Sequence, residues 1–260
     1  MSVVRLEGDC LGGGSGCVEI RKAERFALFL YDGYRNPVSI EYGIDSMRVG
    51  DHVVSVGQKC RVRVVEHLFS ALYAMKLFCV RIDVHGEEIP FFDGSSSEFV
   101  RALRELPSDD LSGIRTTRRI EIDHGSSSIS YTPVPADELV VEMYLKHPYI
   151  GEEQMILNIN ADSYRKEIAP ARTFVFTTED DPRLRNIPPY GVGITEKGIY
   201  SETPLRFENE PVRHKIQDLL GDLHVIGRPL RGKIRGENTS HSLNLAFARI
   251  LISTMKECNG

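Results

Sequence analysis

The sequence predicts an α+β fold, and three observations lead to that prediction. The chain has 260 residues, of which 41% are hydrophobic and 27% charged, the composition of an ordinary globular protein. Stretches with the alternating pattern of strands outnumber stretches with the apolar spacing of helices. Strands and helices also cluster along the chain instead of alternating, which favours α+β over a doubly wound α/β fold.

Charge and cysteine content exclude several classes of protein. With 32 Lys and Arg against 37 Asp and Glu, the formal net charge is −5, so we expect no nucleic-acid partner. No apolar run approaches the roughly 18 residues of a membrane-spanning helix, and the first residues lack a signal-peptide core. The five cysteines include no C-x-x-C pair, which is typical of free thiols in a reducing compartment. We therefore expect a soluble, cytoplasmic protein.

The first half of the chain contains two predicted helices and a strand between them. Apolar residues recur with helical spacing over residues 64–77. Apolar and polar residues then alternate from position 78 to 85, the pattern of a half-buried strand that ends at Gly86. A second helix is expected over residues 99–106, entered through the polar segment 93–97.

Turn-forming residues at 106–113 predict a boundary between two structured halves. We accordingly assign one domain to residues 1–107 and a second to residues 114–260. In the second domain, strands are predicted at residues 119–123, 127–131, 139–145 and 156–159, and helices at residues 210–226 and 242–255. Asn209 is the expected N-cap of the longer helix, with Pro211 in its first turn.

Residues 177–201 stand apart from the segments around them. They contain three prolines and three glycines between the strands and the long helix. Such a stretch is either an irregular insertion or a lid over a site.

The helix at 210–226 has two contrasting faces. His214, Asp218 and Asp222 fall on one side at roughly 100° per residue, and the apolar residues occupy the other side. Gly221 also lies on the polar face, where a close approach by another segment is expected. The polar face is either a solvated surface with a weak His–Asp pair or a source of two metal ligands one turn apart.

Two further segments carry side chains with catalytic potential. Glu66 and His67 lie at the start of the first helix and point away from its apolar stripe. An adjacent Glu–His pair suits a metal ligand beside a general base, but it also suits an exposed pair at a helix N-terminus. His241 lies in a polar turn that leads into the last helix, where it is either a catalytic acid or an ordinary polar residue. The remaining histidines are predicted to be structural: His52, His85, His124, His147 and His224.

Five motifs in a fixed order identify a family resemblance. Over nearly the whole chain, they are similar to the zinc-dependent UDP-3-O-acyl-N-acetylglucosamine deacetylases of lipid A biosynthesis. The motifs are Val65-Glu66-His67-Leu68, Glu88-Ile89-Pro90-Phe91-Phe92-Asp93-Gly94-Ser95, Ala171-Arg172-Thr173-Phe174, Arg213-His214-Lys215 through Gly221-Asp222-Leu223, and Ser240-His241-Ser242-Leu243-Asn244.

The resemblance implies two domains of related topology, each a small sheet layered against helices, with the active site between them. It also implies that His67, His214 and Asp218 bind one zinc ion, although iron(II) is compatible with the same ligands. The implied reaction is hydrolysis of the 2-acetamido group of the acylated UDP-sugar, which releases acetate.

The resemblance assigns a role to each of the other polar residues. Glu66 is the expected base that deprotonates the attacking water. His241 is expected as an imidazolium that stabilises the tetrahedral intermediate or protonates the amine, and Asp222 would orient it. Thr173 and Lys215 would stabilise the oxyanion.

The resemblance also implies how the substrate is held. Phe174, Gly191 and Gly193 are the expected substrate-binding residues. The partner is an acylated UDP-amino sugar, which makes peripheral contact with a membrane possible. We expect the protein to be a monomer.

Three positions depart from the family pattern. Gly14 stands where the family has a histidine, Val65 where it often has threonine, and Asn238 where it often has a basic residue. These departures keep two alternatives open: the same reaction on another N-acetylated sugar or sugar nucleotide, or a catalytically silent relative that binds a ligand. The second alternative is disfavoured because every residue that the reaction needs is present.

Overall fold

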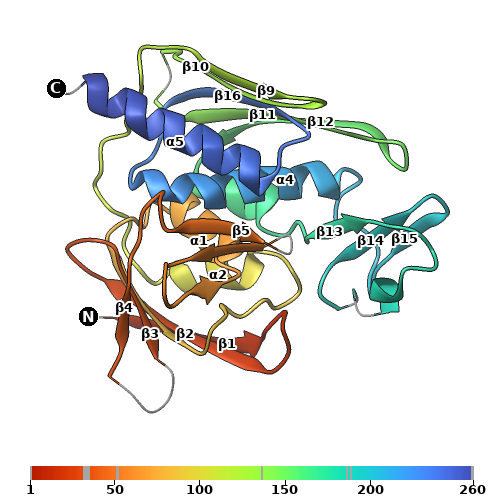
Figure 1. The fold of residues 1–260 in the computed structure, drawn as a ribbon, viewed down its shortest axis with the longest axis horizontal. Coiled ribbons are helices and arrows are strands. Elements are labelled where there is room, and N and C mark those ends of the chain that lie inside the picture. Colours follow the sequence, from red (N-terminus) through yellow and green to blue (C-terminus); the bar gives the residue numbers. More distant parts are fainter. Residues whose placement is uncertain are drawn as a thin grey trace.

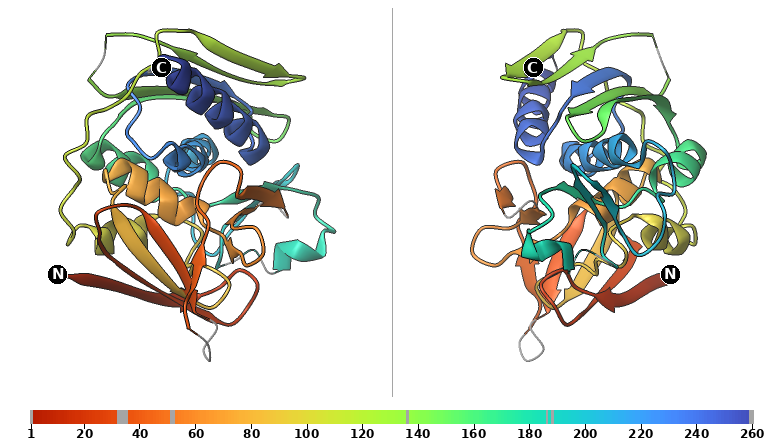
Figure 2. Two further views of the ribbon diagram at one scale, coloured as in Figure 1. Left: turned by 60° about the vertical axis from the view of Figure 1, so that its left-hand side comes forward. Right: turned by 90° about the vertical axis from the view of Figure 1, so that its right-hand side faces the viewer.

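Two five-stranded sheets lie on opposite sides of a central layer of helices, as the computed structural model shows in Figure 1. The structure describes residues 2–31, 36–50, 53–135, 137–185, 187 and 189–258. The helices α1 (Glu66–Ala74) and α4 (Glu210–Leu223) pack against each other between the two sheets, a layering that Figure 2 shows from two further sides. The α+β class predicted from the sequence is confirmed.

The first half of the chain forms one sheet with two helices. Its strands lie in the order β1-β2-β8-β3-β4. Only β3 and β8 are parallel neighbours, and the other pairs are antiparallel. The strands are β1 (Val3–Asp9), β2 (Ser15–Lys22), β3 (Ala27–Tyr31), β4 (Val38–Ile40) and β8 (Val80–His85), and the second helix is α2 (Ser97–Leu103).

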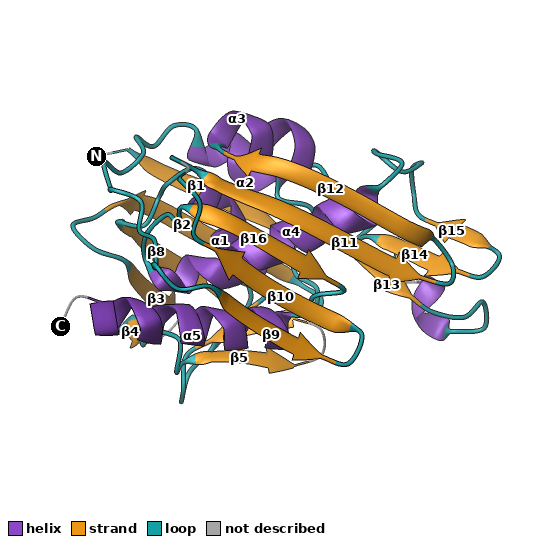
Figure 3. Ribbon diagram, turned by 90° about the horizontal axis from the view of Figure 1, so that it is seen from above, coloured by secondary structure: helices purple, strands orange, loops and turns teal. Residues whose placement is uncertain are grey.

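The second half repeats this arrangement. Its strands lie in the order β12-β11-β16-β10-β9, and Figure 3 shows them side by side from above. Only β11 and β16 are parallel neighbours. The strands are β9 (Ile120–His124), β10 (Ser127–Thr132), β11 (Leu139–His147), β12 (Gly151–Ile159) and β16 (Gly232–Glu237), and the last helix is α5 (His241–Cys258).

The two halves therefore share one topology. If the five strands of each sheet are numbered along the chain, both sheets have the order 1-2-5-3-4, with the single parallel pair between strands 5 and 3. In both halves a long central helix, α1 or α4, lies between strands 4 and 5. A second helix, α2 or α5, follows strand 5. The related topology that the family resemblance implied is confirmed.

Each half also has an insertion between its fourth strand and its central helix, α1 or α4. In the first half this is a three-stranded sheet of β5 (Met47–Gly50), β6 (Val53–Val56) and β7 (Val62–Arg63). The second insertion begins with α3 (Ala161–Ser163) and the π-helix Tyr164–Ile168, and continues with β13 (Phe174–Phe176), the 3-10 helix Pro182–Arg185, β14 (Val192–Thr195) and β15 (Gly198–Tyr200). Strands β13, β14 and β15 form a small sheet at one side of the molecule (Figure 1). The segment 177–201 lies within this second insertion, and part of it is regular: a 3-10 helix and the strands β14 and β15.

Most predicted elements occur close to their expected bounds. The helices predicted at 64–77, 99–106, 210–226 and 242–255 correspond to α1, α2, α4 and α5. The segment between α2 and β9, where we place the domain boundary, contains no helix or strand, and all its residues are described. Asn209 is the N-cap of α4, as predicted, but its side chain makes no capping hydrogen bond and instead accepts one from Arg213 Nε at 2.7 Å.

The close packing of α1 on α4 depends on Gly221. A Cβ atom at this position would collide with the carbonyl oxygen of Glu66, so only glycine lets the two helices approach this closely. Every residue of α1 is buried as a result, and His214, Asp218 and Asp222 on α4 are buried too. The solvated-face alternative for both helices is therefore wrong. Among the described residues, no helix has the length and apolarity needed to cross a bilayer.

Candidate metal centre and active site

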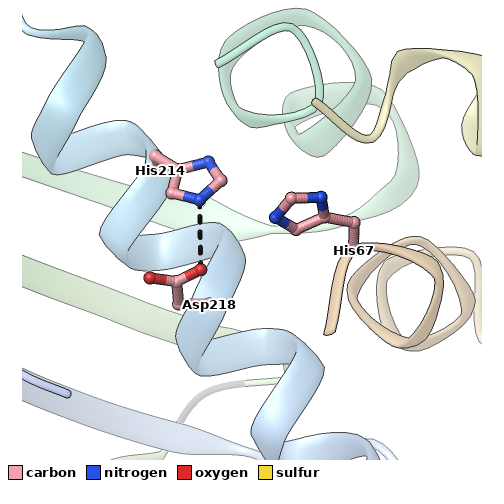
Figure 4. A group of neighbouring side chains, drawn as sticks. All are labelled: His67, His214 and Asp218. Carbon is pink, nitrogen blue, oxygen red and sulfur yellow. Dashed lines mark ion pairs between the residues drawn. The ribbon is translucent and has the colours of Figure 1, made fainter. Parts of the chain in front are cut away.

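A cluster of three side chains lies where α1 meets α4. His67 is the second residue of α1, and His214 and Asp218 lie one turn apart on α4. One ligand atom from each of the three residues lies within 4.8 Å of the others, and all three side chains are buried. Figure 4 shows both imidazole rings and the carboxylate facing the same small space.

The donor set of this cluster fits a metal ion. His214 Nδ1 lies 3.1 Å from the carbonyl oxygen of Ala171, which can only accept, so Nδ1 donates and Nε2 is the ring nitrogen that faces the cluster. His214 Nε2 is 3.2 Å from Asp218 Oδ1. His67 Nδ1 is buried and has no hydrogen-bond partner among the described residues. Two imidazoles and one carboxylate with a further position open are the ligands of a catalytic metal site.

The surroundings of the cluster favour the metal-binding forms of His67 and Asp218. Burial, reinforced by the neighbouring His214, lowers the pKa of His67 to about 3, so its imidazole is neutral. Burial alone would raise the pKa of Asp218, but the positive charge of Lys215, with His214 and His241, holds it well below its usual value. Lys215 Nζ donates to Asp218 Oδ2 at 2.9 Å. The carboxylate is therefore ionised.

Glu66 is the first residue of α1 and lies directly beside the cluster. Its Oε2 accepts a hydrogen bond from the backbone N–H of Val54 on β6, at 3.1 Å. Burial raises its pKa to about 7, although the charge of His241 opposes the shift. A carboxylate with a pKa near neutrality is suited to accept a proton from water at neutral pH.

His241 and Asp222 form a hydrogen-bonded pair across two helices. His241 is the first residue of α5, and its Nδ1 donates to Asp222 Oδ2 on α4 at 2.8 Å. Asn244 Nδ2 donates to the same oxygen at 2.9 Å. Burial alone would lower the pKa of His241, but Asp222 and Asp218 raise it to about 9. His241 is thus an imidazolium at neutral pH, and its Nε2 lies 4.0 Å from Asp218 Oδ1, towards the cluster.

A cavity of about 990 Å³ connects these residues to an apolar passage. Its polar end is formed by the metal cluster with Glu66, Lys215 and His241. Its apolar walls come from both insertions and from the loops beside them: Leu11, Val49, Val53, Phe91, Val175, Ile187, Tyr190 and Val192. The cavity therefore lies between the two halves and joins a charged end to a hydrophobic end.

The structure brings most of the predicted substrate and oxyanion residues to this cavity. Thr173, Phe174, Lys215 and Gly191 line it. Lys215 Nζ lies 5.5 Å from the centroid of the Phe174 ring. A Cβ on Gly191 would approach the carbonyl oxygen of Thr173 to 2.7 Å, so this glycine allows β13 and β14 to lie close together. Gly193 is not among the lining residues, and a Cβ there would meet Leu184 instead.

Two of the three departures from the family pattern, Gly14 and Asn238, lie outside the cavity lining. Gly14 lies in the turn between β1 and β2, with a φ of +80° that favours glycine, and it does not line the cavity. Asn238 has a φ of +47°, and its Oδ1 accepts a hydrogen bond from the backbone N–H of Lys146 at 2.7 Å. Its side chain therefore fixes the end of β16 against β11.

Four of the histidines predicted to be structural lie outside the cavity lining: His85, His124, His147 and His224. His224 is buried and stacks on Phe78, with the ring planes 7° apart. His147 stacks on Phe176 at 3.6 Å, and His85 stacks on Tyr31 at 4.7 Å. His124 ends β9 with an exposed side chain, and His52 lies outside the described residues.

Several functional features had no clear signal in the sequence. The Ala171 carbonyl that orients His214 is a backbone group, which no residue pattern reveals. Gln217 is completely buried, with Nε2 3.2 Å from His214 Nδ1, and its position one turn after His214 was the only available hint. Val53 and Val49 line the cavity from β6 and β5, two short strands that were not predicted.

A buried cluster of two histidines and an aspartate, beside a glutamate and a hydrogen-bonded His–Asp pair, is the arrangement expected of a metal-dependent hydrolase. The comparison with known proteins is more specific. The chain belongs to the LpxC family of UDP-3-O-acyl N-acetylglycosamine deacetylases, whose family model matches residues 23–253. Members of this family are deacetylases, hydrolases that cleave an amide.

Three curated relatives, all named UDP-3-O-acyl-N-acetylglucosamine deacetylase, illustrate the similarity. The protein of Chlamydia pneumoniae is 34% identical over 226 residues, which cover 79% of this chain and 79% of the relative. That of Geotalea uraniireducens is 30% identical, covering 84% of this chain and 74% of the relative. That of Thermodesulfovibrio yellowstonii is 32% identical, covering 75% and 70% respectively.

Proposed function

We propose that this protein removes acetate from the 2-acetamido group of UDP-3-O-acyl-N-acetylglucosamine, the deacetylation step of lipid A biosynthesis. One observation carries the proposal: a single cavity is lined by the three candidate metal ligands, Glu66 and His241 and also by a group of apolar side chains. A substrate with an amide on its sugar and an acyl chain needs both the polar side chains, for the reaction, and the apolar side chains, for the acyl chain. The relatives that share most of the chain carry this activity in their names.

We propose zinc as the metal. Two imidazoles and one carboxylate are typical ligands of catalytic zinc, and iron(II) accepts the same set. When bound, zinc would act as a Lewis acid on water and on the amide carbonyl. His67, His214 and Asp218 would hold it.

Different side chains around the triad carry out the two proton transfers of the reaction. Glu66, with its raised pKa, takes the proton of the attacking water as the tetrahedral intermediate forms. His241, held as an imidazolium by Asp222, stabilises the negative charge of that intermediate and protonates the departing amine. Thr173 and Lys215 lie at the cavity wall, where they would interact with the oxyanion.

The apolar passage would hold the 3-O-acyl chain. Its walls include Phe91, Tyr190 and Val192, with Leu11 and Val49 towards the outside, where their side chains are 43% and 39% exposed. Burying an apolar chain there is favourable by roughly 0.8 kcal/mol per methylene. The sugar amide then lies at the polar end, beside Glu66.

A different N-acetylated sugar or sugar nucleotide is the second candidate. It is favoured by Asn238, whose uncharged side chain is already bonded to the backbone of Lys146 and supplies no cation for a diphosphate. The two candidates share the metal site and the reaction, and differ only in the substrate.

The experiment compares acetate release from three substrates by the zinc-loaded protein: UDP-3-O-acyl-N-acetylglucosamine, UDP-N-acetylglucosamine, and the acylated sugar without its nucleotide. The proposal expects turnover of the first and much slower turnover of the second, because the apolar passage would be empty. Equal rates on the first and third substrates would favour the second candidate. No turnover of any of them, with zinc bound, would contradict the proposed substrate class.

We also propose that the enzyme works as a cytoplasmic monomer with two domains, residues 1–107 and 114–260. Both walls of the cavity come from one chain, so a second copy is not needed to complete the site. Sedimentation at several concentrations tests the assembly, and limited proteolysis tests the boundary, with first cleavage expected within 104–119.

A further inference from the structure

The carboxylate of Glu210 lies at the first position of α4 and is only 1% exposed. Its Oε1 accepts the backbone N–H and the Nε–H of Arg172, at 2.9 and 2.8 Å. Its Oε2 accepts the backbone N–H of Arg206 at 2.7 Å and Nη2 of Arg172 at 3.1 Å. One buried carboxylate thus receives four hydrogen bonds, three of them from a single residue.

The guanidinium of Arg172 is likewise fully hydrogen-bonded. Besides Glu210, its Nη2 donates to the carbonyl oxygen of Pro204 at 3.0 Å. Its Nη1 donates to Thr203, to Oγ1 at 3.0 Å and to the carbonyl oxygen at 3.4 Å. All five N–H groups of the guanidinium are used, and the side chain is 3% exposed. A lysine ammonium has three donors and no planar fork, so it cannot reproduce this pattern.

In the sequence, Arg172 lies between two residues that contact the active site directly. The carbonyl oxygen of Ala171, one position earlier, accepts the Nδ1–H of His214. Thr173, one position later, lines the cavity, and its backbone N–H donates to Gly94 at 2.8 Å. Glu210 in turn lies one helical turn before His214 on α4. The Arg172–Glu210 pair therefore fixes segment 171–173 against α4 at the level of the metal ligand.

We propose that Arg172 and Glu210 are positioning residues for the metal centre. They hold the Ala171 carbonyl against His214 Nδ1 and so fix the orientation in which His214 Nε2 points at the metal. The same contact places Thr173 at the cavity wall. This inference rests on the proposed metal-dependent function, and it assigns that role to two residues outside the triad and the proton-transfer groups.

Stability alone would not require so specific an arrangement. A buried ion pair contributes little net stability, because the cost of removing both charges from water offsets most of their attraction, and apolar residues of similar size often replace it without loss. Orientation of a metal ligand is more demanding, since loss of an outer hydrogen bond to a ligand weakens metal binding by about 10- to 100-fold. Stability and metal affinity can thus be separated experimentally.

The test uses the double variant R172M/E210M and the single variant R172K in the full chain. The double variant replaces the pair by apolar side chains and leaves no unpaired charge, whereas R172K keeps the charge but loses the fork. Zinc affinity is measured by competition with a chromogenic chelator, on protein whose fold is checked by circular dichroism and thermal unfolding. The control is R21M/D83M, a partly buried pair that joins β2 and β8 at 2.7 Å, with Arg21 29% and Asp83 3% exposed; neither residue lines the cavity.

We expect R172M/E210M to fold and to bind zinc about 10- to 100-fold more weakly than wild type. R172K should show the same direction of change, with kcat reduced more than KM is altered, and the control should keep wild-type affinity. Wild-type zinc affinity in folded R172M/E210M would overturn the inference. If the double variant does not fold, wild-type affinity in R172K would overturn it. Failure of the wild-type protein to bind zinc would instead contradict the proposed function.

Discussion

The carbonyl oxygen of Glu66 rests directly against Gly221, so α1 and α4 touch where no side chain separates them. This contact explains how the two halves build one site. Because the helices lie so close, His67 on α1 reaches His214 and Asp218 on α4, and the three ligand atoms come within 4.8 Å of each other. The geometry of the metal site therefore depends on a helix contact rather than on any of its ligands.

Replacing Gly221 by alanine tests this contact. Alanine has the higher helix propensity by about 1 kcal/mol. Its Cβ would nevertheless collide with Glu66, so we expect G221A to lose about 1–3 kcal/mol of unfolding free energy and to bind zinc more weakly. Urea denaturation and zinc titration measure the two effects. The matched control is G43A, at a glycine with open space around it, and equal behaviour of both variants would contradict the contact.

Removal of the base should separate catalysis from metal binding. E66Q keeps the shape of the side chain but cannot accept a proton, so we expect kcat to fall by about 10²- to 10⁴-fold with the zinc content unchanged. H214A should instead lose zinc, because a ligand is removed. The two variants are compared by acetate release and by metal analysis of the same samples. Near-normal turnover of zinc-loaded E66Q would mean that another group is the base.

The pair formed by His241 and Asp222 should matter for kcat and not for the metal. In D222N the amide cannot stabilise the imidazolium, although Nδ1 of His241 still has an oxygen in reach. We expect kcat to fall by about 10²-fold, which is the size of effect seen when general acid–base catalysis is lost. Zinc affinity should be nearly unchanged. Unchanged turnover would show that His241 does not need its charge held by Asp222.

His224 predicts a pH dependence of stability that is independent of the active site. Burial lowers its pKa to about 4, and its Nδ1 is 2.7 Å from the hydroxyl oxygen of Tyr42. The unfolded chain binds a proton there from pH ~6.5 downward, whereas the folded chain does not until about pH 4. Above pH ~6.5, His224 therefore adds no pH dependence to the free energy of unfolding. As the pH falls from that value towards 4, His224 lowers this free energy and destabilises the folded protein.

The measurement for His224 compares wild type with H224F, which preserves the aromatic packing on Phe78. The difference in unfolding free energy between the two proteins should be constant above pH ~6.5. Between that pH and about 4 it should shift by roughly 3 kcal/mol in favour of the variant, from about 1.36 kcal/mol per unit of pKa difference. A difference that does not change with pH would contradict this prediction.

The sequence indicated which side chains lie together better than it indicated their surroundings. The structure brings Glu66, His214 and His241 from three separate motifs to one cavity, and Gly221 indicated a close approach that the structure confirms. The polar helix faces gave no sign of burial, because the periodicity of one helix does not reveal which other helix covers it. That information lies in the tertiary contact between α1 and α4.

The fold was predicted unevenly for a similar reason. The long helices and the strands β9, β10 and β11 carry clear periodic patterns and formed near their expected bounds, whereas β12 begins at Gly151, five residues before its predicted start. Strands β5, β6 and β7 have two to four residues each, too few for a pattern to repeat. Strands β14 and β15 lie among prolines and glycines, where pairing with a neighbour overrides the local turn preference.

The most direct test of the account is metal removal and restoration during acetate release from UDP-3-O-acyl-N-acetylglucosamine. We expect a chelator to abolish turnover, one equivalent of zinc per chain to restore it, and H214A to show neither bound zinc nor recovery. Turnover that persists in protein shown to be free of metal would contradict the account, and so would full recovery of activity in H214A.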